Sequence, residues 1–337
     1  MVKANGYGLG AVPVTQALEA IDPWGYGVAT VDEGAELRAA GISRPIIVFT
    51  PLPADPAAVA ALRAYELRPV IGDLAALDAW LAGEERGGPF HVEIDTGLSR
   101  SGFVWHDQAG LAALRTRLNE APAWEGVFTH FHSADLEPAS VTIQRERFDL
   151  VLASLPRRPR LVHFASSAAL RWGPGWGGDL VRPGIFLYGG RAGGLVAEPV
   201  ARLRTRVIAL RRLRPGDPVS YGAEWTAERA TTIATLAVGY ADGVLRALGN
   251  RGMVEINEAV VPIAGRVTMD MVMVDAGDSP VAIGDVATLY GGTVTLDDQA
   301  ARAGTVSYEL LTAVSARVPR RYDRTGGRED GKAGGGP

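Results

Sequence analysis

Cysteine is absent from all 337 residues of the sequence, which excludes disulfide bridges, thiolate metal ligands and a cysteine nucleophile. No apolar run approaches the roughly 18 residues of a membrane-spanning helix, and no secretory signal is recognisable. The formal net charge of −4 at pH 7 disfavours a protein that binds nucleic acid through many phosphate contacts. We therefore expect a cytoplasmic protein with no metal site, no membrane partner and no nucleic-acid partner.

What the sequence has instead is a globular composition that is rich in glycine. Hydrophobic residues make up 47% and charged residues 21%, which suits a large buried core. The 42 glycines are about twice the usual share of roughly 7%. They follow no triplet period, so they indicate turns and close backbone approaches rather than collagen. The length predicts about two domains, at roughly 150 residues each.

The N-terminus begins abruptly. Val2 and Lys3 have the pattern of a strand end, and a strand rarely starts at an initiating methionine. We therefore expect a longer natural N-terminus or a misplaced start, and the missing piece could have carried a targeting signal.

The first part of the chain alternates short β-rich runs with amphipathic stretches. Eight runs have the pattern of strands: Met1–Ala4, Tyr26–Thr30, Pro45–Phe49, Leu67–Ile71, Phe90–Asp95, Gly126–His130, Leu161–Phe164 and Leu180–Arg182. Helical patterns lie among them at Val31–Ala40, Asp107–Asn119 and Val141–Leu155. Eight strands that alternate with helices predict a parallel (β/α)8 barrel over residues 1–192. A doubly wound sheet is the alternative.

The pattern changes after residue 192. Strand-like runs then follow at short spacing, with few helical signals before Ser307–Val318. They lie at Val200–Leu213, Thr231–Val238, Gly252–Ile256, Val260–Ala264, Met271–Asp275 and Val286–Tyr290. The predicted fold class is thus α/β, a TIM-type barrel followed by a mostly β C-terminal domain over 193–323. The Gly-rich, charged tail, 324–337, is predicted to be disordered.

The C-terminal ends of barrel strands are where active residues gather. These ends carry a lysine, two arginines, a histidine, hydroxyl groups and a Gly-Ile peptide: Lys3, Arg100, His130, Ser166, Ser167, Arg182, Gly184 and Ile185. Together they predict an anionic small molecule in the mouth of the barrel, with backbone N–H groups turned to a phosphate. A desolvated lysine beside a cation has a lowered pKa, which suits covalent chemistry with a carbonyl.

Several motifs resemble those of alanine racemases and occur in the order of that family. The segment VKANGYGLG closely resembles the family's pyridoxal-phosphate lysine motif. The others are EIDTGLSRSG, THFHSAD, HFASSAAL, VRPGIFLYG, VSYGAEWTA, VGYADG, GRVTMDMVMVD and TVSYELL. The family is built as a (β/α)8 barrel followed by a β domain, which agrees with the architecture expected above.

The resemblance implies a pyridoxal 5'-phosphate-dependent enzyme that interconverts L-alanine and D-alanine and feeds D-alanine to cell-wall synthesis. Lys3 would carry the cofactor and act as one base. Tyr221 would act as the other base, reaching the site from the partner subunit of a homodimer with shared active sites. Two bases on opposite faces of a carbon invert it by removing a proton from one side and returning one to the other.

Further residues carried over from the resemblance bind the cofactor. Arg182 would hydrogen-bond the pyridine nitrogen and, because arginine stays protonated, keep that nitrogen unprotonated. His130 would link Tyr221 to Arg182, and His163 would lie behind Arg182. The phosphate would be bound by Tyr7, Ser167, Gly184, Ile185 and Tyr308.

Substrate binding is assigned by the same resemblance to Arg100 and to the backbone N–H of Met269, which would bind the carboxylate of alanine. Many members of the family carry a carbamylated lysine where this chain has Glu93. Since Glu93 and Asp95 share one face of their strand, we expect Glu93 to orient Arg100 in place of a carbamate. The alternative is that Glu93 only caps a polar layer of the barrel.

Three other functions are weighed against alanine racemisation. A racemase of broader specificity is a close variant, and an inactive, truncated cofactor-binding protein is a second. Pyridoxal-phosphate decarboxylases of basic amino acids use a related fold, but they rely on a cysteine and on an acid at the pyridine nitrogen. The absence of cysteine and the presence of Arg182 disfavour them.

Overall fold

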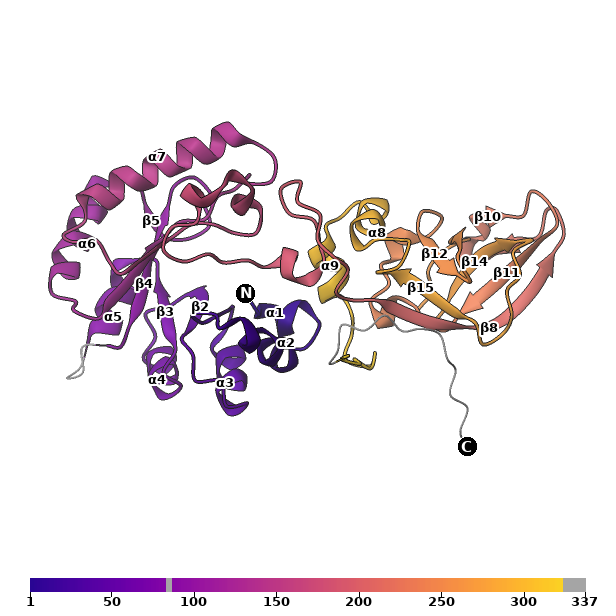
Figure 1. Ribbon diagram of the computed structural model, residues 1–337, viewed down its shortest axis with the longest axis horizontal. Coiled ribbons are helices and arrows are strands. Elements are labelled where there is room, and N and C mark those ends of the chain that lie inside the picture. Colours follow the sequence, from indigo (N-terminus) through magenta and orange to yellow (C-terminus); the bar gives the residue numbers. More distant parts are fainter. Residues whose placement is uncertain (83–86, 324–337) are drawn as a thin grey trace.

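Parallel strands and helices alternate through the first part of the chain, as the hydrophobic pattern predicts (Figure 1). The structure is a computed structural model that describes residues 1–82 and 87–323. The tail predicted to be disordered, 324–337, lies outside the described residues. The strands pair in the order β1-β2-β3-β4-β6-β7, and the short β5 pairs with β4. They are β1 (Tyr26–Val28), β2 (Ile46–Pro51), β3 (Arg68–Ile71), β4 (Phe90–Asp95), β5 (Phe103–Val104), β6 (Trp124–Phe128) and β7 (Leu161–His163).

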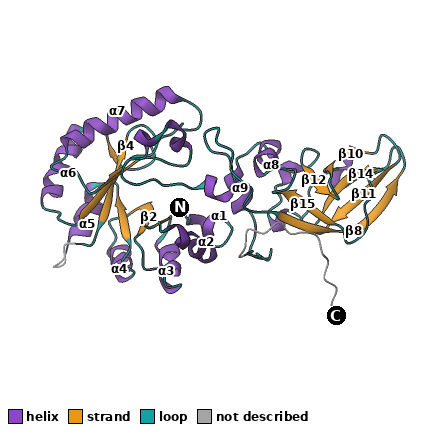
Figure 2. Cartoon of the chain, in the orientation of Figure 1, coloured by secondary structure: helices purple, strands orange, loops and turns teal. Residues whose placement is uncertain are grey.

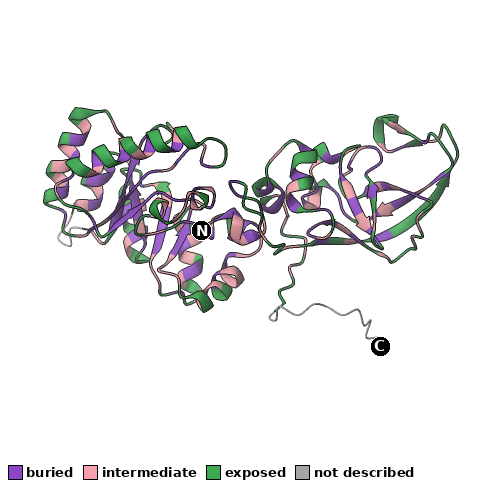
Figure 3. Cartoon of the chain, turned by 45° about the horizontal axis from the view of Figure 1, so that its top comes forward, coloured by how far each residue is buried: buried purple, intermediate pink, exposed green. Residues whose placement is uncertain are grey.

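The helices surround this sheet (Figure 2). They are α2 (Ala11–Leu18), α3 (Val31–Ala39), α4 (Pro56–Ala64), α5 (Leu74–Leu81), α6 (Gln108–Asn119) and α7 (Pro138–Ser154). Side-chain caps set several starts: Thr30 and Glu33 form a reciprocal capping box on α3, and Asp55, Asp73 and Asp107 accept backbone N–H groups at α4, α5 and α6. Figure 3 shows buried strands inside and exposed outer helix faces.

The predicted strand Met1–Ala4 is wrong. Val2 N donates to Gly27 O of β1 at 2.9 Å, which is the start of a strand pairing. The chain then passes through left-handed backbone at Ala4 and Asn5, each with φ of 53°, and this turn takes it out of the sheet.

The predicted strand Leu180–Arg182 is also wrong. Arg182 N donates to Ala165 O at 2.9 Å, but Pro183 follows directly and has no N–H to continue a ladder. Met1 N donates to Pro183 O at 3.0 Å. The two segments therefore join β7 to β1 through isolated bridges and hydrogen bonds rather than through a continuous ladder, and the strand ends still converge on one mouth.

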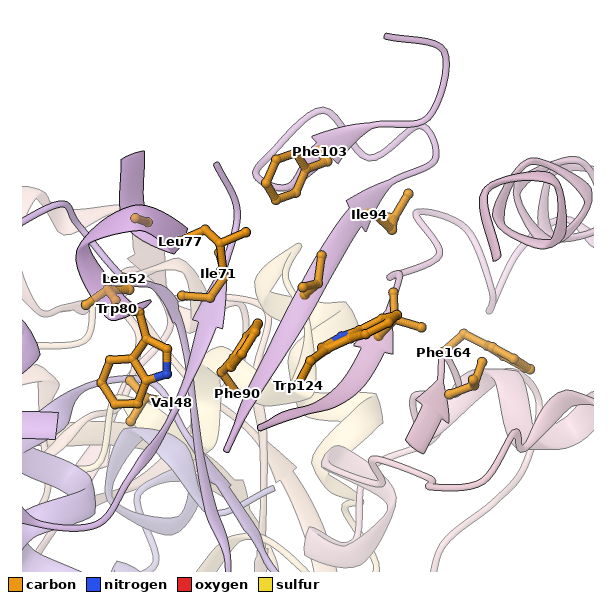
Figure 4. Packing of buried hydrophobic residues seen from close by; sticks show 14 of the residues in the cluster. Val48, Leu52, Ile71, Leu77, Trp80, Phe90, Ile94, Phe103, Trp124 and Phe164 are labelled. Carbon is orange, nitrogen blue, oxygen red and sulfur yellow. The ribbon is translucent and has the colours of Figure 1, made fainter. Parts of the chain in front are cut away.

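Large apolar side chains fill the layer between sheet and helices (Figure 4). Trp80 of α5, Phe90 of β4 and Trp124 of β6 are each at most 3% exposed. Burying a side chain of this size stabilises a fold by roughly 1.5–3 kcal/mol. This core makes the barrel a rigid support for residues at the strand ends.

The second part of the chain is mostly antiparallel β structure, as predicted. Its sheet has the order β13-β12-β15-β8-β11-β14, and β9 pairs with β10. The strands are β8 (Leu203–Leu213), β9 (Pro218–Val219), β10 (Trp225–Thr226), β11 (Thr231–Leu236), β12 (Met253–Ile256), β13 (Ala259–Pro262), β14 (Val272–Gly277) and β15 (Val286–Tyr290). Two helices, α8 (Leu296–Ala303) and α9 (Ser307–Thr312), follow. The helix predicted over Ser307–Val318 is too long, because Ser315 N leaves the helical ladder and donates to Asp242 O.

The two parts meet where α9 packs on the turn after Lys3, α1 (Lys3–Tyr7). A Cβ on Gly8 would lie 2.2 Å from Leu311 O, so only glycine allows this approach. Tyr7 stacks on Tyr188 with ring centroids 4.4 Å apart. Within residues 1–82 and 87–323, no helix is both long and apolar enough to cross a membrane.

Candidate active site

Lys3 stands at the mouth of the barrel, where the chain leaves the sheet. Glu33 supports the left-handed turn that follows, because its Oε1 accepts the Ala4 N–H at 2.7 Å and its Oε2 accepts the Ala29 N–H at 2.6 Å. Burial and the positive charge of Arg100 lower the pKa of Lys3, against the opposing effect of Glu33. A lowered pKa increases the share of neutral amine, which is the nucleophilic form.

Arg182 is the buried cation of the site, with 7% exposure. Its Nη2 donates to Thr129 O at 2.9 Å, and its Nη1 lies 2.6 Å from His163 Nδ1. The guanidinium also lies over the ring of Phe128, 5.1 Å from the centroid. Burial lowers the pKa of Arg182 to about 9, so the group is still charged at neutral pH and is held in one orientation.

His130 lies on the other side of Arg182. The distance from Arg182 Nη2 to His130 Nδ1 is 3.3 Å. Burial and the charges of Arg182, Arg100 and Lys3 lower the pKa of His130 to about 3. His130 is therefore neutral at pH 7. Because its Nδ1 accepts from Arg182, its proton is on Nε2, which can donate a hydrogen bond to a phenol oxygen.

The hydroxyl groups predicted to bind a phosphate gather around Gly184. Ser167 Oγ accepts the Gly184 N–H at 2.7 Å. A Cβ on Gly184 would lie 2.3 Å from the hydroxyl oxygen of Tyr7, so the site requires a glycine there. Tyr308 of α9 lies beside Tyr7, with ring centroids 6.0 Å apart. Ile185 begins a short 3-10 helix, Ile185–Tyr188, directly after Gly184.

A cavity of about 430 Å³ adjoins these groups. Its lining includes His130, Ser166 and Tyr308, so it opens onto the residues described above. The volume is ample for a small amino acid.

Arg100 and Glu93 form a contact at the same mouth. Glu93 is 3% exposed, and its Oε2 accepts a hydrogen bond from Ser101 Oγ at 2.7 Å. Its Oε1 lies 3.9 Å from Arg100 Nη2. Burial raises the pKa of Glu93, while Ser101 and Arg100 oppose this. The Arg100 side chain is 61% exposed and so remains available to a carboxylate.

Removal of the Glu93 charge should weaken substrate binding. Glu93→Gln keeps the shape and the Ser101 contact but releases Arg100, so the KM for alanine should rise several-fold, by about 1–2 kcal/mol of lost orientation. Steady-state kinetics measure this, with Glu36→Gln on the exposed face of α3 as the matched charge control. A lower melting temperature with unchanged KM would assign Glu93 to packing alone.

Tyr221 and Met269 are not joined to this cluster within one chain. Tyr221 lies between β9 and β10 and is 72% exposed, and Met269 is 53% exposed. Figure 1 shows β10 in the β domain, well away from the N-terminus. Among the residues that the structure describes, neither side chain has a hydrogen bond, ion pair or ring contact with Lys3 or Arg182.

Comparison with known proteins decides the family. Residues 1–192 match the model "Alanine racemase, N-terminal domain", and residues 200–322 match "Alanine racemase, C-terminal domain". The chain belongs to the alanine racemase family. The predicted resemblance and fold class, a TIM-type barrel with a β domain, are confirmed.

Individual alanine racemases match almost the whole chain. The enzyme of Salinispora arenicola is 40% identical over 96% of this chain and 91% of its own length, and that of Acidiphilium cryptum is 39% identical over 95% and 90%. Among solved structures, the biosynthetic alanine racemase of Pseudomonas aeruginosa has a TM-score of 0.87 at 37% identity, covering 96% of this chain and 91% of that one. The structure from Bartonella henselae, which has covalently bound pyridoxal phosphate, has a TM-score of 0.88 at 30% identity, with the same coverage.

Sequence reasoning missed residues that hydrogen-bond the groups of the site without being part of it. It assigned no role in the site to Glu33, although Glu33 accepts the Ala4 N–H in the turn after Lys3. It did not find His91 or Glu125, which continue the hydrogen bonds of His163. For His91, the period-2 alternation with Glu93 was an available signal, because it places both side chains on one face of β4.

Proposed function

We propose that this protein is a pyridoxal-phosphate-dependent racemase that interconverts L-alanine and D-alanine. The observation that carries the proposal is the convergence of buried Arg182 and neutral His130 on Lys3 at the barrel mouth. Lys3 and Lys332 are the only lysines of the sequence, so Lys3 is the single candidate for covalent cofactor attachment among residues 1–82 and 87–323. The family membership agrees with this assignment.

The residues present suit pyridoxal phosphate. The missing Cβ of Gly184 leaves space beside the Tyr7 hydroxyl, and Ser167 and Tyr308 would add hydroxyl donors for the phosphate with the Gly184–Ile185 main chain. Arg182 would donate to the pyridine nitrogen and, being charged, keep it unprotonated. When bound, the cofactor supplies an aldehyde that condenses with an amine and an electron sink that acidifies the Cα proton of an amino acid.

The proton transfers are assigned to two side chains on opposite faces. Lys3 Nζ would take or return the Cα proton of D-alanine, helped by its lowered pKa. The hydroxyl of Tyr221 of the partner subunit would do the same for L-alanine, with neutral His130 as the neighbour whose Nε2–H donates to the phenol oxygen and stabilises its ionised form. Arg100 and the Met269 N–H would hold the substrate carboxylate, Arg100 under the orienting charge of Glu93.

A homodimer with shared active sites is part of the proposal. Tyr221 is a large, exposed aromatic residue in the β domain. Met269 and Met271, which are close to each other in sequence, are exposed apolar residues of the same domain. Such side chains are typical of an interface. A two-fold pair would deliver each Tyr221 to the barrel of the other chain. We also propose a cytoplasmic location, on the absence of cysteine from the sequence.

Racemisation in deuterated water tests the proposal. The purified chain, loaded with pyridoxal phosphate, should convert L-alanine to an equal mixture of enantiomers and replace the Cα proton by deuterium. Chiral chromatography and proton NMR measure the two events. L-Serine under the same conditions separates an alanine racemase from an enzyme of broader specificity.

Two results would contradict the assignment. Cofactor binding without exchange of the Cα proton would identify a carrier or an inactive protein. Exchange with retention of configuration would show that only one of the two bases acts.

A further inference from the structure

A line of hydrogen bonds crosses the interior of the barrel from Arg182 to its opposite end. Arg182 Nη1 lies 2.6 Å from His163 Nδ1, and His163 Nε2 lies 2.8 Å from His91 Nδ1. His91 Nε2 then lies 3.3 Å from Glu125 Oε2. Arg68 Nε donates to the same carboxylate oxygen at 2.6 Å. Two cations thus flank two histidines and one carboxylate.

The chemistry of the two ends sets the direction of every bond in this line. A guanidinium can only donate, so His163 Nδ1 must accept, and neutral His163 must carry its proton on Nε2. That proton is donated to His91 Nδ1, which leaves the proton of His91 on Nε2, directed at Glu125. An ionised carboxylate can only accept. The line is therefore consistent only when both histidines are in the Nε2–H tautomer.

The charge states agree with this pattern. Burial lowers the pKa of His163 well below its usual value, and burial also lowers the pKa of His91 against the pull of Glu125. Burial disfavours ionisation of Glu125, but the hydrogen bonds from His91 and Arg68 outweigh it and lower its pKa to about 2. At neutral pH the histidines are thus neutral and Glu125 is a carboxylate.

Packing prevents either imidazole from turning away. His91 and His163 have no exposed surface. The ring of Phe128 stacks on His163, with centroids 4.9 Å apart. A Cβ on Gly126 would lie 2.2 Å from His91 Nδ1, so only a glycine at position 126 allows the His91 ring to lie there. With the rings held, the only freedom left is which nitrogen carries the proton.

We propose that Glu125 is a positioning residue whose carboxylate fixes the tautomers of His91 and His163 and so keeps the lone pair of His163 Nδ1 on Arg182. With the opposite tautomer, an N–H of His163 would face an N–H of Arg182. The guanidinium would then lose the hydrogen bond to His163 that holds it in position. The functional consequence rests on the proposed function, in which Arg182 bonds the pyridine nitrogen. Glu125 then controls the cofactor end of the barrel without contact with cofactor or substrate.

Solid-state 15N NMR of the full chain, loaded with pyridoxal phosphate and labelled at histidine, tests the proposal directly. The sequence has five histidines, and substitution of the exposed His106 and His132 by asparagine assists assignment. The wild type should show His91 and His163 as neutral Nε2–H tautomers. In Glu125→Gln, the amide can donate as well as accept, so a fraction of both rings should change to the Nδ1–H tautomer. Glu120→Gln, which removes the same charge at an exposed position, should leave the spectrum unaltered.

Kinetics provide the second readout. Glu125→Gln should lower kcat about ten-fold and leave KM for alanine within about two-fold, because only the support of Arg182 is lost. Wild-type tautomers in a folded Glu125→Gln protein would overturn the proposal, even if its melting temperature falls. If that variant does not fold, an Nδ1–H or protonated ring for His91 or His163 in the wild type overturns it equally. A tautomer change in a protein that does not racemise alanine would instead reject the proposed function and leave the tautomer control standing.

Discussion

Lys3→Ala is expected to abolish both covalent cofactor attachment and racemisation. Among residues 1–82 and 87–323, Lys3 is the only lysine; it lies near Arg100, and burial lowers its pKa. Loss of the attachment point and of one base together should slow D-alanine formation by more than about 10⁴-fold. Borohydride reduction followed by peptide mass mapping measures attachment, and chiral chromatography measures racemisation.

The sequence provides its own control for this experiment. Lys332 is the only other lysine, so Lys332→Ala should retain both the reducible link and the activity. In the wild type after borohydride reduction, the cofactor mass should appear on the peptide that contains Lys3. A cofactor that borohydride still fixes to the Lys3→Ala chain would show that Lys3 is not the attachment residue.

Mixing two inactive chains is expected to restore racemisation. Lys3→Ala and Tyr221→Phe each remove one of the two bases, and the second change alone should cost about 10²–10⁴-fold. If Tyr221 serves the partner's barrel, a mixed dimer has one site with both defects and one intact site. Equal mixing with free exchange then restores about a quarter of all sites in a two-fold dimer.

Subunit exchange must be shown independently, by mass spectrometry of differently tagged chains. Mixtures of either variant with itself serve as the baseline. Proven exchange without recovered activity would place Tyr221 in the site of its own chain and contradict the shared-site arrangement. Such a result would also require Tyr221 to move toward Lys3, because the two are not in contact within one chain.

Local patterns were sufficient for most elements of the fold. β4 was predicted at Phe90–Asp95 with the bounds found, and α3 was predicted at Val31–Ala40, within one residue of its observed end at Ala39. These elements are determined by neighbouring residues: alternation, caps and breakers. The predicted strands Met1–Ala4 and Leu180–Arg182 were wrong because a β-rich run does not by itself ensure strand pairing. A left-handed turn ends the first segment, and a proline directly after Arg182 ends the second.

The functional residues divide in the same way. Lys3, Arg100, His130 and Arg182 could be gathered from sequence because the C-terminal ends of parallel strands meet at one face. Alternation with Glu93 could place His91 on the inner face of β4. It could not predict the partners of His91, because its hydrogen bonds reach His163 and Glu125, which lie 72 and 34 positions away. No local pattern encodes which of many polar residues will face one another inside a barrel.

The sequence by itself determined the family, the two architectures and the set of groups at the barrel mouth, because motifs and hydrophobic periods are properties of neighbouring residues. Only the tertiary structure decided how those groups are held. It showed that Arg182 is buried against His163, that Glu93 accepts a hydrogen bond from Ser101, and that Tyr221 is exposed in the β domain, out of contact with Lys3 of its own chain. Burial, proton direction and contact are relations across the fold, since they depend on which distant segments exclude water and which atoms face each other.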